Sequence, residues 1–349
     1  MDDADREEPA LAGQPSVGGR ARGAMAPEAD LAGAHAERVA AVPIKSLKRP
    51  RPPKRGTRGW ERWRGWLATL PYVAPLLIAS VAVVVAPAIF GLSRSLFNWQ
   101  PGTSSPFTGL SNFKLLADSP TFRSILVNEG YYLLGLPVWT LLPLLIAVFL
   151  FNRVRIAGLV RTLIFLPVVV SPALLGIMFT PILAPEGLVN TTLQDAGLRG
   201  LAHPWIDSPS LVKPTIIMIL AWANVGLGVA IFTAALTSIQ PDLLDAAAVA
   251  GAGSWQRIRY VILPGIRRTL ILWMTFQALG VFLWLFGLIY SLTAGGPGNS
   301  SASIDYDVFT NTITNGLFGV GAAESVYLLV MVILIAIAAW AIGRRWSHE

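Results

Sequence analysis

Residues 215–239 read TIIMILAWANVGLGVAIFTAALTSI, and residues 240–264, which follow at once, read QPDLLDAAAVAGAGSWQRIRYVILP. The first stretch holds no Asp, Glu, Lys or Arg. At a rise of about 1.5 Å per residue, it is long enough to cross the roughly 30 Å hydrocarbon core of a bilayer as a helix. The second stretch is polar and carries two glycines near its middle. Together they predict a membrane-spanning helix that leads into a structured polar connection.

Five similar apolar runs occur elsewhere in the chain. Overall, 54% of the residues are hydrophobic and 13% are charged, whereas a soluble domain has about 25% charged residues. Prolines such as Pro143 lie inside these runs, where neighbouring groups in a membrane bundle can satisfy the carbonyls that proline leaves free. We therefore predict an all-α, polytopic membrane protein with six transmembrane helices, at about residues 67–92, 130–151, 162–183, 215–239, 269–292 and 321–342.

Residues 1–58 are rich in Ala, Gly, Pro, Arg and Glu and show no apolar periodicity. Such a segment cannot bury enough surface to offset its chain entropy, so we predict a disordered cytosolic tail ahead of a membrane domain at 59–349. The tail ends in a basic run, Lys45–Arg58, which is followed by Trp60, Trp63 and Trp66. Basic residues followed by Trp are typical of a membrane–water boundary, and we prefer that interpretation to nucleic-acid binding.

The distribution of basic residues predicts the orientation. Of the 27 Lys and Arg residues, 18 flank the predicted helices on the side of the tail and five lie on the other side. By the positive-inside rule, both termini and residues 240–264 are cytoplasmic. The chain has no Cys, and His35, His203 and His348 lie far apart in polar segments. No metal site and no cofactor are predicted.

Residues 240–264 exceed the length that a simple turn between two helices needs. Pro241 suits the first position of a helix, and Asp242 and Asp245 suit the positive end of its dipole. Gly251 and Gly253 permit a sharp turn, after which a second helix is expected from Trp255 to Leu263, ending at Pro264. Leu244, Ala247, Ala248 and Gly251 are expected to share one face of the first helix.

Two interpretations of this polar connection fit its physical chemistry equally well. An Ala-rich helix with a face of small residues permits close approach of another protein. Alternatively, the connection is an interfacial helix that lies on the membrane without a partner.

The connection resembles the "EAA" loop of ABC importer permeases. Ala246, Ala247, Gly251, Ala252, Trp255, Gln256, Leu263 and Pro264 match the pattern in register. Three positions depart from it: Asp245 stands where Glu is usual, Ala250 where Asp is usual, and Arg268 where Pro often follows. The residues for which the resemblance implies a role in coupling to an ATPase are Pro241, Asp242, Leu244, Asp245, Ala246, Ala247, Ala248, Gly251, Ala252, Trp255, Leu263 and Pro264.

Three further stretches resemble the carbohydrate-uptake (maltose-type, binding-protein-dependent) branch of that family. They are Phe107–Phe113, Arg161–Pro167 with Ser171-Pro172, and Leu292–Pro297. The resemblance implies a type I importer permease fold with a cytosolic coupling helix, in the inner membrane of a bacterium. It also implies transport of a sugar or sugar-like solute into the cytoplasm, driven by ATP-dependent closure of a separate ATPase.

The chain itself is expected to be a transport subunit and not an enzyme, because it contains no G-x-x-x-x-G-K-[ST] motif for ATP binding. The resemblance implies two copies of an ATP-binding subunit, a second permease subunit of different but similar sequence, and an extracytoplasmic solute-binding protein. No nucleic-acid partner is expected.

Solute contacts are expected from polar and aromatic residues at membrane depth in the fourth and fifth runs, because sugars offer hydroxyls to amides and C–H faces to aromatic rings. For each of these residues, packing between helices is an alternative role. The candidates are Trp222, Asn224, Trp273, Gln277, Trp284 and Tyr290.

Three rival functions fit the sequence less well. An ion-coupled secondary transporter often carries ionisable groups within the membrane, whereas the six apolar runs, with the last counted from Ser325, contain no Asp, Glu, Lys or Arg. A membrane-embedded enzyme needs a catalytic constellation, whereas Glu129 and Glu324 are isolated in the sequence at the outer ends of the second and sixth runs. A structural membrane protein has no need of a long cytosolic helix–turn–helix.

Overall fold

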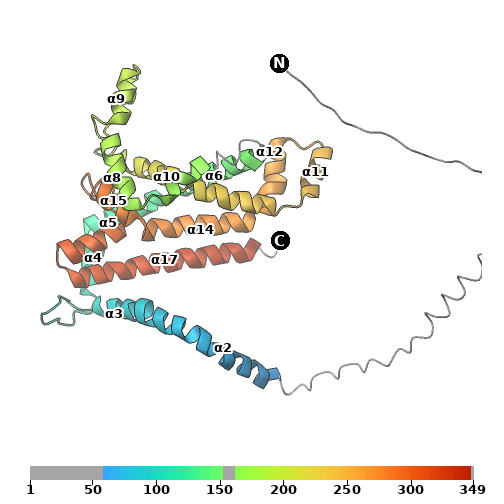
Figure 1. Ribbon diagram of the computed structural model, residues 1–349. Helices are drawn as coiled ribbons and strands as arrows, with labels where there is room; N and C mark the ends of the chain where they lie inside the picture. The colour runs from blue at the N-terminus through green and yellow to red at the C-terminus, as the bar shows by residue number, and fades with distance from the viewer. Residues whose placement is uncertain (1–57, 152–161, 347–349) are drawn as a thin grey trace, which may run out of the picture. The chain divides into compact units, whose positions relative to one another are not determined.

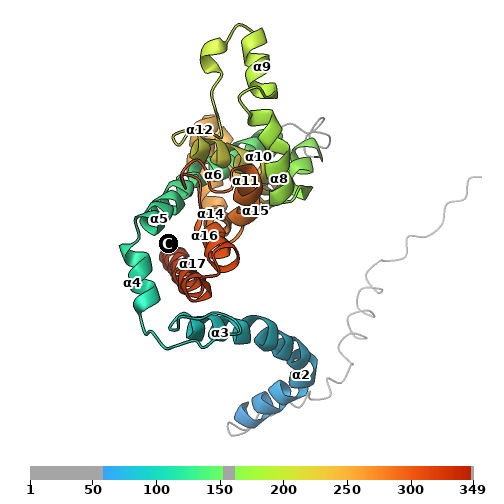
Figure 2. The same cartoon turned by 90° about the vertical axis from the view of Figure 1, so that its left-hand side faces the viewer.

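The computed structural model describes residues 58–151 and 162–346, and most of these residues are helical (Figures 1 and 2). Within them the one β-bridge joins Phe97 to Phe107. The all-α architecture expected from the sequence is therefore confirmed. The predicted disordered tail, apart from Arg58, lies outside the described residues, as do Arg153, Arg155 and Arg161, which contribute to the predicted orientation.

The chain divides into two units, one up to Val73 and one from Ala74 onward. The described part of the first unit is the beginning of helix α2 (Arg58–Ser80). In the second unit this helix continues into a π-helical turn, η1 (Val81–Val85), and helix α3 (Ala86–Arg94). Pro87 lacks an N–H and would clash with the carbonyl of Val83 in a regular helix, so a wider turn at this point relieves the clash.

Five helices among the described residues are long and apolar enough to span a membrane: Thr69–Arg94, Pro120–Phe151, Pro172–Asp195, Val212–Thr237 and Phe318–Arg345. A sixth is obtained if the bent pair Ser254–Gly265 and Arg267–Leu283 counts as one span. In detail the second unit contains α4 (Ser111–Asp118), α5 (Pro120–Leu133), α6 (Leu136–Phe151), η2 (Leu166–Val169), α8 (Pro172–Leu183), α9 (Leu188–Asp195), η3 (Arg199–Leu201), α10 (Val212–Thr237), α14 (Arg267–Leu283), α15 (Leu285–Leu292), α16 (Ile304–Phe309), η5 (Thr310–Thr314) and α17 (Phe318–Trp346).

Two of the predicted spans are interrupted in the structure. The span expected at 162–183 includes the 3₁₀ turn η2, and helix α8 begins afresh at Pro172. There the Ser171 hydroxyl caps α8 by accepting a hydrogen bond from the Leu174 N–H at 3.3 Å. The span expected at 269–292 is divided at Trp284 into α14 and α15. Both breaks lie beside the same pocket, which is described below.

Helices α6 and α10 pack closely in the centre of the second unit. At Gly228 of α10, an added Cβ would lie 2.6 Å from the Pro143 Cβ and 2.9 Å from the Trp273 Cζ2, so only glycine fits there without a shift. Lipid chains are as apolar as a leucine side chain, and helices in a membrane are therefore held together by such close packing and by interhelical hydrogen bonds.

Two indole groups provide interhelical hydrogen bonds at this centre. The Trp273 Nε1–H donates to the Trp139 carbonyl at 2.9 Å, and the Trp139 Nε1–H donates to the Ile217 carbonyl at 2.9 Å. Pro143 stands four residues after Trp139 and has no N–H, so helix α6 cannot satisfy the Trp139 carbonyl by itself. The expectation that a neighbouring helix would supply the missing donor is confirmed here.

The ends of the helices separate into two groups along the second unit (Figure 1). Helices α4 and α9 lie at one end, which we call the α9 end. Helices α11 (Pro241–Val249) and α12 (Ser254–Arg257) lie at the other, the α11 end, together with the C-terminal part of α17.

At the α9 end, side chains of α5 hold the segment that leads into α16. Glu129 accepts a hydrogen bond from the Ile304 N–H at 2.7 Å, and the Tyr132 hydroxyl donates to the Ser301 carbonyl at 2.8 Å. From α17, Glu324 accepts a hydrogen bond from the Asn311 side chain at 2.7 Å. Glu129 and Glu324, which are isolated in the sequence, thus each gain a hydrogen-bond partner from another element of the structure.

We expect Glu129→Ala to lower the free energy of unfolding by about 1–3 kcal/mol, because it leaves the buried Ile304 N–H without an acceptor. Glu129→Gln keeps an oxygen at that position and should lose less. The measurement is thermal unfolding of the purified protein in detergent, with Glu186→Ala, an exposed position, as the control. Equal loss in Glu129→Ala and Glu186→Ala would contradict this role.

Candidate functional site

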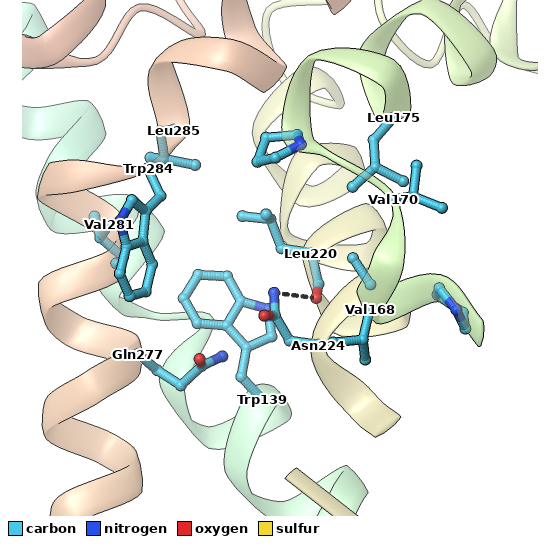
Figure 3. A pocket seen from close by; sticks show the side chains of 14 residues that line it. Trp139, Val168, Val170, Leu175, Leu220, Asn224, Gln277, Val281, Trp284 and Leu285 are labelled. Atoms are coloured by element: carbon cyan, nitrogen blue, oxygen red, sulfur yellow. Dashed lines mark hydrogen bonds between the residues drawn. The ribbon is translucent and has the colours of Figure 1, made fainter. Parts of the chain in front are cut away.

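A pocket of about 740 Å³ lies among α6, η2, α8, α10, α14 and α15 (Figure 3). It therefore sits where the two interrupted spans meet the close-packed centre. None of the described residues that line it is charged. They are Trp139, Pro167, Val168, Val170, Pro172, Leu175, Leu220, Ala223, Asn224, Gln277, Gly280, Val281, Trp284 and Leu285.

Two amides supply most of the polar side-chain atoms of this pocket. The Asn224 Nδ2 donates to the Leu220 carbonyl at 3.0 Å, one turn earlier in the same helix. That bond holds the amide in place and leaves its carbonyl oxygen available. Gln277 comes from α14, and Figure 3 shows it with Asn224 and Trp284 around the Trp139 indole. The pocket thus offers amide donors and acceptors beside aromatic faces, without a net charge.

The structure brings three of the six predicted solute-contact residues into this pocket: Asn224, Gln277 and Trp284. The other three lie elsewhere. Trp222 belongs to an apolar pocket with Phe179 and Met218, and Tyr290 to a pocket with Thr180, Asp207 and the backbone around Pro297.

Trp273 is the third residue outside the pocket, and it has a structural role. Its side chain is 2% exposed and its indole N–H is used by the Trp139 carbonyl. Conversely, Trp139 lines the pocket but is not among the six predicted residues, which all lie in the fourth and fifth runs. The sequence feature that points to Trp139 is Pro143, four residues later. Because proline has no N–H, the Trp139 carbonyl needs a hydrogen-bond donor from another helix.

A carboxylate fixes the start of helix α15 next to the pocket. Asp305 accepts hydrogen bonds from the Phe286 N–H at 2.7 Å and the Tyr306 N–H at 2.8 Å, and from the Ser303 hydroxyl. Burial raises the pKa of Asp305 above its ordinary value, and these hydrogen bonds to the charged form act in the opposite direction. The position of α15, and with it that of Leu285 in the pocket wall, depends on this cap.

The polar connection at the α11 end has the expected helix–turn–helix form. Helix α11 ends at Val249 and is closed by hydrogen bonds from the Gly251 N–H to the Ala248 carbonyl at 3.0 Å and from the Ala252 N–H to the Ala247 carbonyl at 2.9 Å. Gly251 has a φ of +79°, a left-handed conformation that favours glycine. A second helical segment follows, comprising α12, the π-helical turn η4 (Ile258–Ile262) and α13 (Leu263–Gly265).

The faces of α11 differ from the expectation in part. Leu244 packs against the buried cluster at the ends of α6 and α10, and Ala247 is half-buried. Ala248 and Gly251 are exposed, and Gly251 follows the end of the helix, so only Leu244 and Ala247 of the four predicted residues are partly buried. The exposed surface carries large apolar side chains: Leu243, Val249 at 91% exposure, and Trp255. Apolar side chains gathered on a polar connection mark a surface that binds another protein or a membrane.

The connection joins helix α14 at a sharp bend. Residues Ser254–Gly265 and Arg267–Leu283 make an angle of 75°, with Ile266 at the corner and 1% exposed. The second helix of the connection was expected to end at Pro264, but it continues to Gly265. Pro264 follows the π-helical turn η4, whose wider geometry accommodates a residue without an N–H, so the bend falls two residues later.

The described residues form a helical bundle of membrane-spanning length around an uncharged pocket, with a structured polar connection at one end. These features are typical of a membrane transport protein. Residues 131–348 match the family of binding-protein-dependent transport system inner membrane components, and the chain belongs to this family. It is thus a permease subunit of an ATP-driven importer, and not an enzyme. The secondary transporter and the membrane-embedded enzyme are not supported.

Similar proteins cover most of the chain. The probable starch degradation products transport system permease protein AmyD of Thermoanaerobacterium thermosulfurigenes is 27% identical over 76% of this chain and 90% of its own length. The sn-glycerol-3-phosphate transport system permease protein UgpA of Agrobacterium fabrum is 30% identical over 76% of this chain and 92% of its own. A crystal structure of a bacterial ABC transporter that imports alginate has the same fold, with a TM-score of 0.71 and 24% identity over 82% of this chain and 99% of that chain.

We expect Trp273→Phe to cost about 1–3 kcal/mol of unfolding free energy, because the buried Trp139 carbonyl loses its donor. In a Pro143→Ala background, an N–H at position 143 can satisfy that carbonyl, so the same substitution should cost less. Thermal unfolding of the four proteins of this cycle measures the difference, and Trp222→Phe, a partly exposed position, is the control. An equal cost in both backgrounds would rule out the proline as the reason for this hydrogen bond.

Proposed function

We propose that this permease subunit carries a neutral sugar or sugar-like solute into the cytoplasm through the pocket of Trp139, Asn224, Gln277 and Trp284. The observation that carries the proposal is the lining itself, in which two amides and two indoles surround a space without a charged side chain. Sugars offer hydroxyl groups to amides and C–H faces to aromatic rings. The similar protein AmyD is named as a probable permease for starch degradation products, which supports a saccharide as the solute.

A glycerol phosphate ester is a weaker candidate, although one relative is named for it. A phosphate dianion inside a membrane needs cationic partners, because the transfer of an unpaired charge from water is costly. The described pocket offers none. The charge of the lining thus favours the neutral class of solute.

We further propose that α11 is the coupling helix, which docks on a separate ATP-binding subunit. The exposed surface of the connection carries Leu243 and Val249 on α11 and Trp255 on α12, whereas Leu244 packs the other side of α11 against the bundle. From the bend at Ile266, helix α14 runs directly to Gln277, which at about 1.5 Å per residue lies roughly 15 Å away. Movement of α11 therefore reaches the pocket wall through one continuous helix.

The assembly that follows contains two copies of the ATP-binding subunit, a second permease subunit of similar but different sequence, and an extracytoplasmic solute-binding protein. In this arrangement the α11 end and both termini face the cytoplasm, and the α9 end faces the solute-binding protein. Lys and Arg residues next to the predicted helices are more frequent on the side of the N-terminal tail than on the other side, which supports this orientation. The whole subunit then occupies the bacterial inner membrane, with residues 1–58 as its cytosolic tail and 59–349 as its membrane domain.

For the solute path, we expect Asn224→Leu and Gln277→Leu each to raise the KM for uptake about tenfold, because a hydrogen bond to the solute is lost. The control is Thr233→Val, which removes a hydroxyl from α10 outside the pocket; that hydroxyl has no hydrogen-bond partner among the described residues. Uptake of radiolabelled maltose, or of another saccharide that proves to be transported, into proteoliposomes with the complete transporter gives the values. Unchanged KM in both pocket variants would refute this path.

For the coupling helix, we expect Val249→Asp to reduce copurification of the ATP-binding subunit about tenfold or more, because a charge enters the centre of an apolar contact. The matched control is Leu198→Asp, an apolar side chain with 50% exposure near the α9 end. Transport by the complete complex should fall with copurification. Full copurification and transport in Val249→Asp, or equal losses in both variants, would exclude docking through this surface.

A further inference from the structure

A second large pocket lies between α14 and α17, away from the solute path. It measures about 1090 Å³ and is lined by Arg267, Arg268, Ile271, Leu272, Thr275, Ala339, Trp340, Gly343 and Arg344. Its residues come from the first turns of α14 and the last turns of α17, at the α11 end of the unit. None of them lines the pocket of Asn224 and Gln277.

The lining of this pocket is divided by polarity along the helices. Arg267, Arg268 and Arg344 form a basic rim at the helix ends, and none of the described residues of the lining is acidic. Helix α14 begins at Arg267, so the positive end of its dipole adds to the same rim. The rim therefore attracts an anion with the three guanidinium groups and the helix end together.

Apart from Thr275, the rest of the wall is apolar, and it belongs to segments of membrane-spanning composition. Leu272 is 71% exposed and Trp340 is 64% exposed, and both lie in segments of membrane-spanning composition. The Arg344 guanidinium lies 5.4 Å from the centre of the Trp340 ring, an arrangement found at membrane–water interfaces. A water-soluble partner could reach the rim, but it could not cover the apolar wall below it.

We propose that this pocket binds an anionic phospholipid, with its phosphate at the three arginines and its acyl chains along Leu272 and Trp340. The charge of the rim and the polarity of the wall match the two ends of such a molecule. The site lies immediately after the bend at Ile266. A bound lipid thus contacts both α17 and the first turn of the helix that links α11 to the solute pocket, and its occupancy biases movement of that helix.

The test measures lipid binding to the purified complete transporter in detergent by native mass spectrometry, with dioleoylphosphatidylglycerol and dioleoylphosphatidylcholine as probes. We expect several-fold tighter binding of the phosphatidylglycerol. Arg344→Gln should weaken it about fivefold, because one guanidinium is removed from the rim. Arg345→Gln is the matched control, since it makes the same charge change at the next position, outside the lining.

A second pair of variants tests the shape of the pocket without a change in charge. A Cβ at Gly343 meets no atom within 4 Å, so Gly343→Ala should fold normally and leave the pocket open. Gly343→Leu should fill part of the pocket and weaken phosphatidylglycerol binding at least as much as Arg344→Gln does. Thermal unfolding of each variant verifies that its fold is intact before binding is compared.

The outcomes separate the possible occupants. Equal binding of the two lipids, equal effects of Arg344→Gln and Arg345→Gln, or full binding in Gly343→Leu would each overturn the proposal. Displacement of phosphatidylglycerol by inorganic phosphate at a similar concentration would assign the rim to a free anion instead. Loss of the ATP-binding subunit from Arg344→Gln, with unchanged lipid binding, would assign it to an acidic protein surface. The lipid measurement does not depend on uptake, so it stands or fails apart from the proposed solute and coupling roles.

Discussion

The hydrogen bond from the Trp273 indole to the Trp139 carbonyl is the contact on which the centre of the molecule depends. It exists because Pro143 leaves that carbonyl without a donor in its own helix, at a depth where water is absent. The Trp139 indole in turn donates to Ile217, so α14, α6 and α10 are joined in one chain of bonds. These are also the three helices that carry Gln277, Trp139 and Asn224 into the pocket.

The pocket occurs where regular helices stop. Helix η2 ends and α8 begins on one side of it, and α14 gives way to α15 at Trp284 on another. Each break exposes backbone groups that need partners in a membrane, and here side chains provide them, as Ser171 does for α8 and Asp305 for α15. The structure therefore combines a packed centre with irregular backbone only where that backbone surrounds a cavity.

The two ends of the bundle differ in how they are held. At the α9 end, Glu129, Tyr132 and Glu324 hold the segment around α16 by buried hydrogen bonds. At the α11 end the connection packs on the bundle through Leu244, Ile258, Ile262 and Leu263, and presents Leu243, Val249 and Trp255 outward. The α9 end is thus held by buried polar contacts, and the α11 end by apolar packing. The basic rim of the pocket between α14 and α17 lies next to the bend at Ile266, where the connection joins α14.

The sequence by itself determined the helical membrane architecture, the helix–turn–helix of residues 240–264 and the family, because long uncharged runs, Gly251 and the loop pattern are local features. It also identified Asn224, Gln277 and Trp284 as candidates for the pocket. Only the tertiary structure removed Trp222, Trp273 and Tyr290 from that set, added Trp139, and gave Glu129 and Glu324 their partners. The physical reason is that helical periodicity fixes which residues share a face, whereas the faces that meet are decided by close packing and by the carbonyls and N–H groups that each helix cannot satisfy alone.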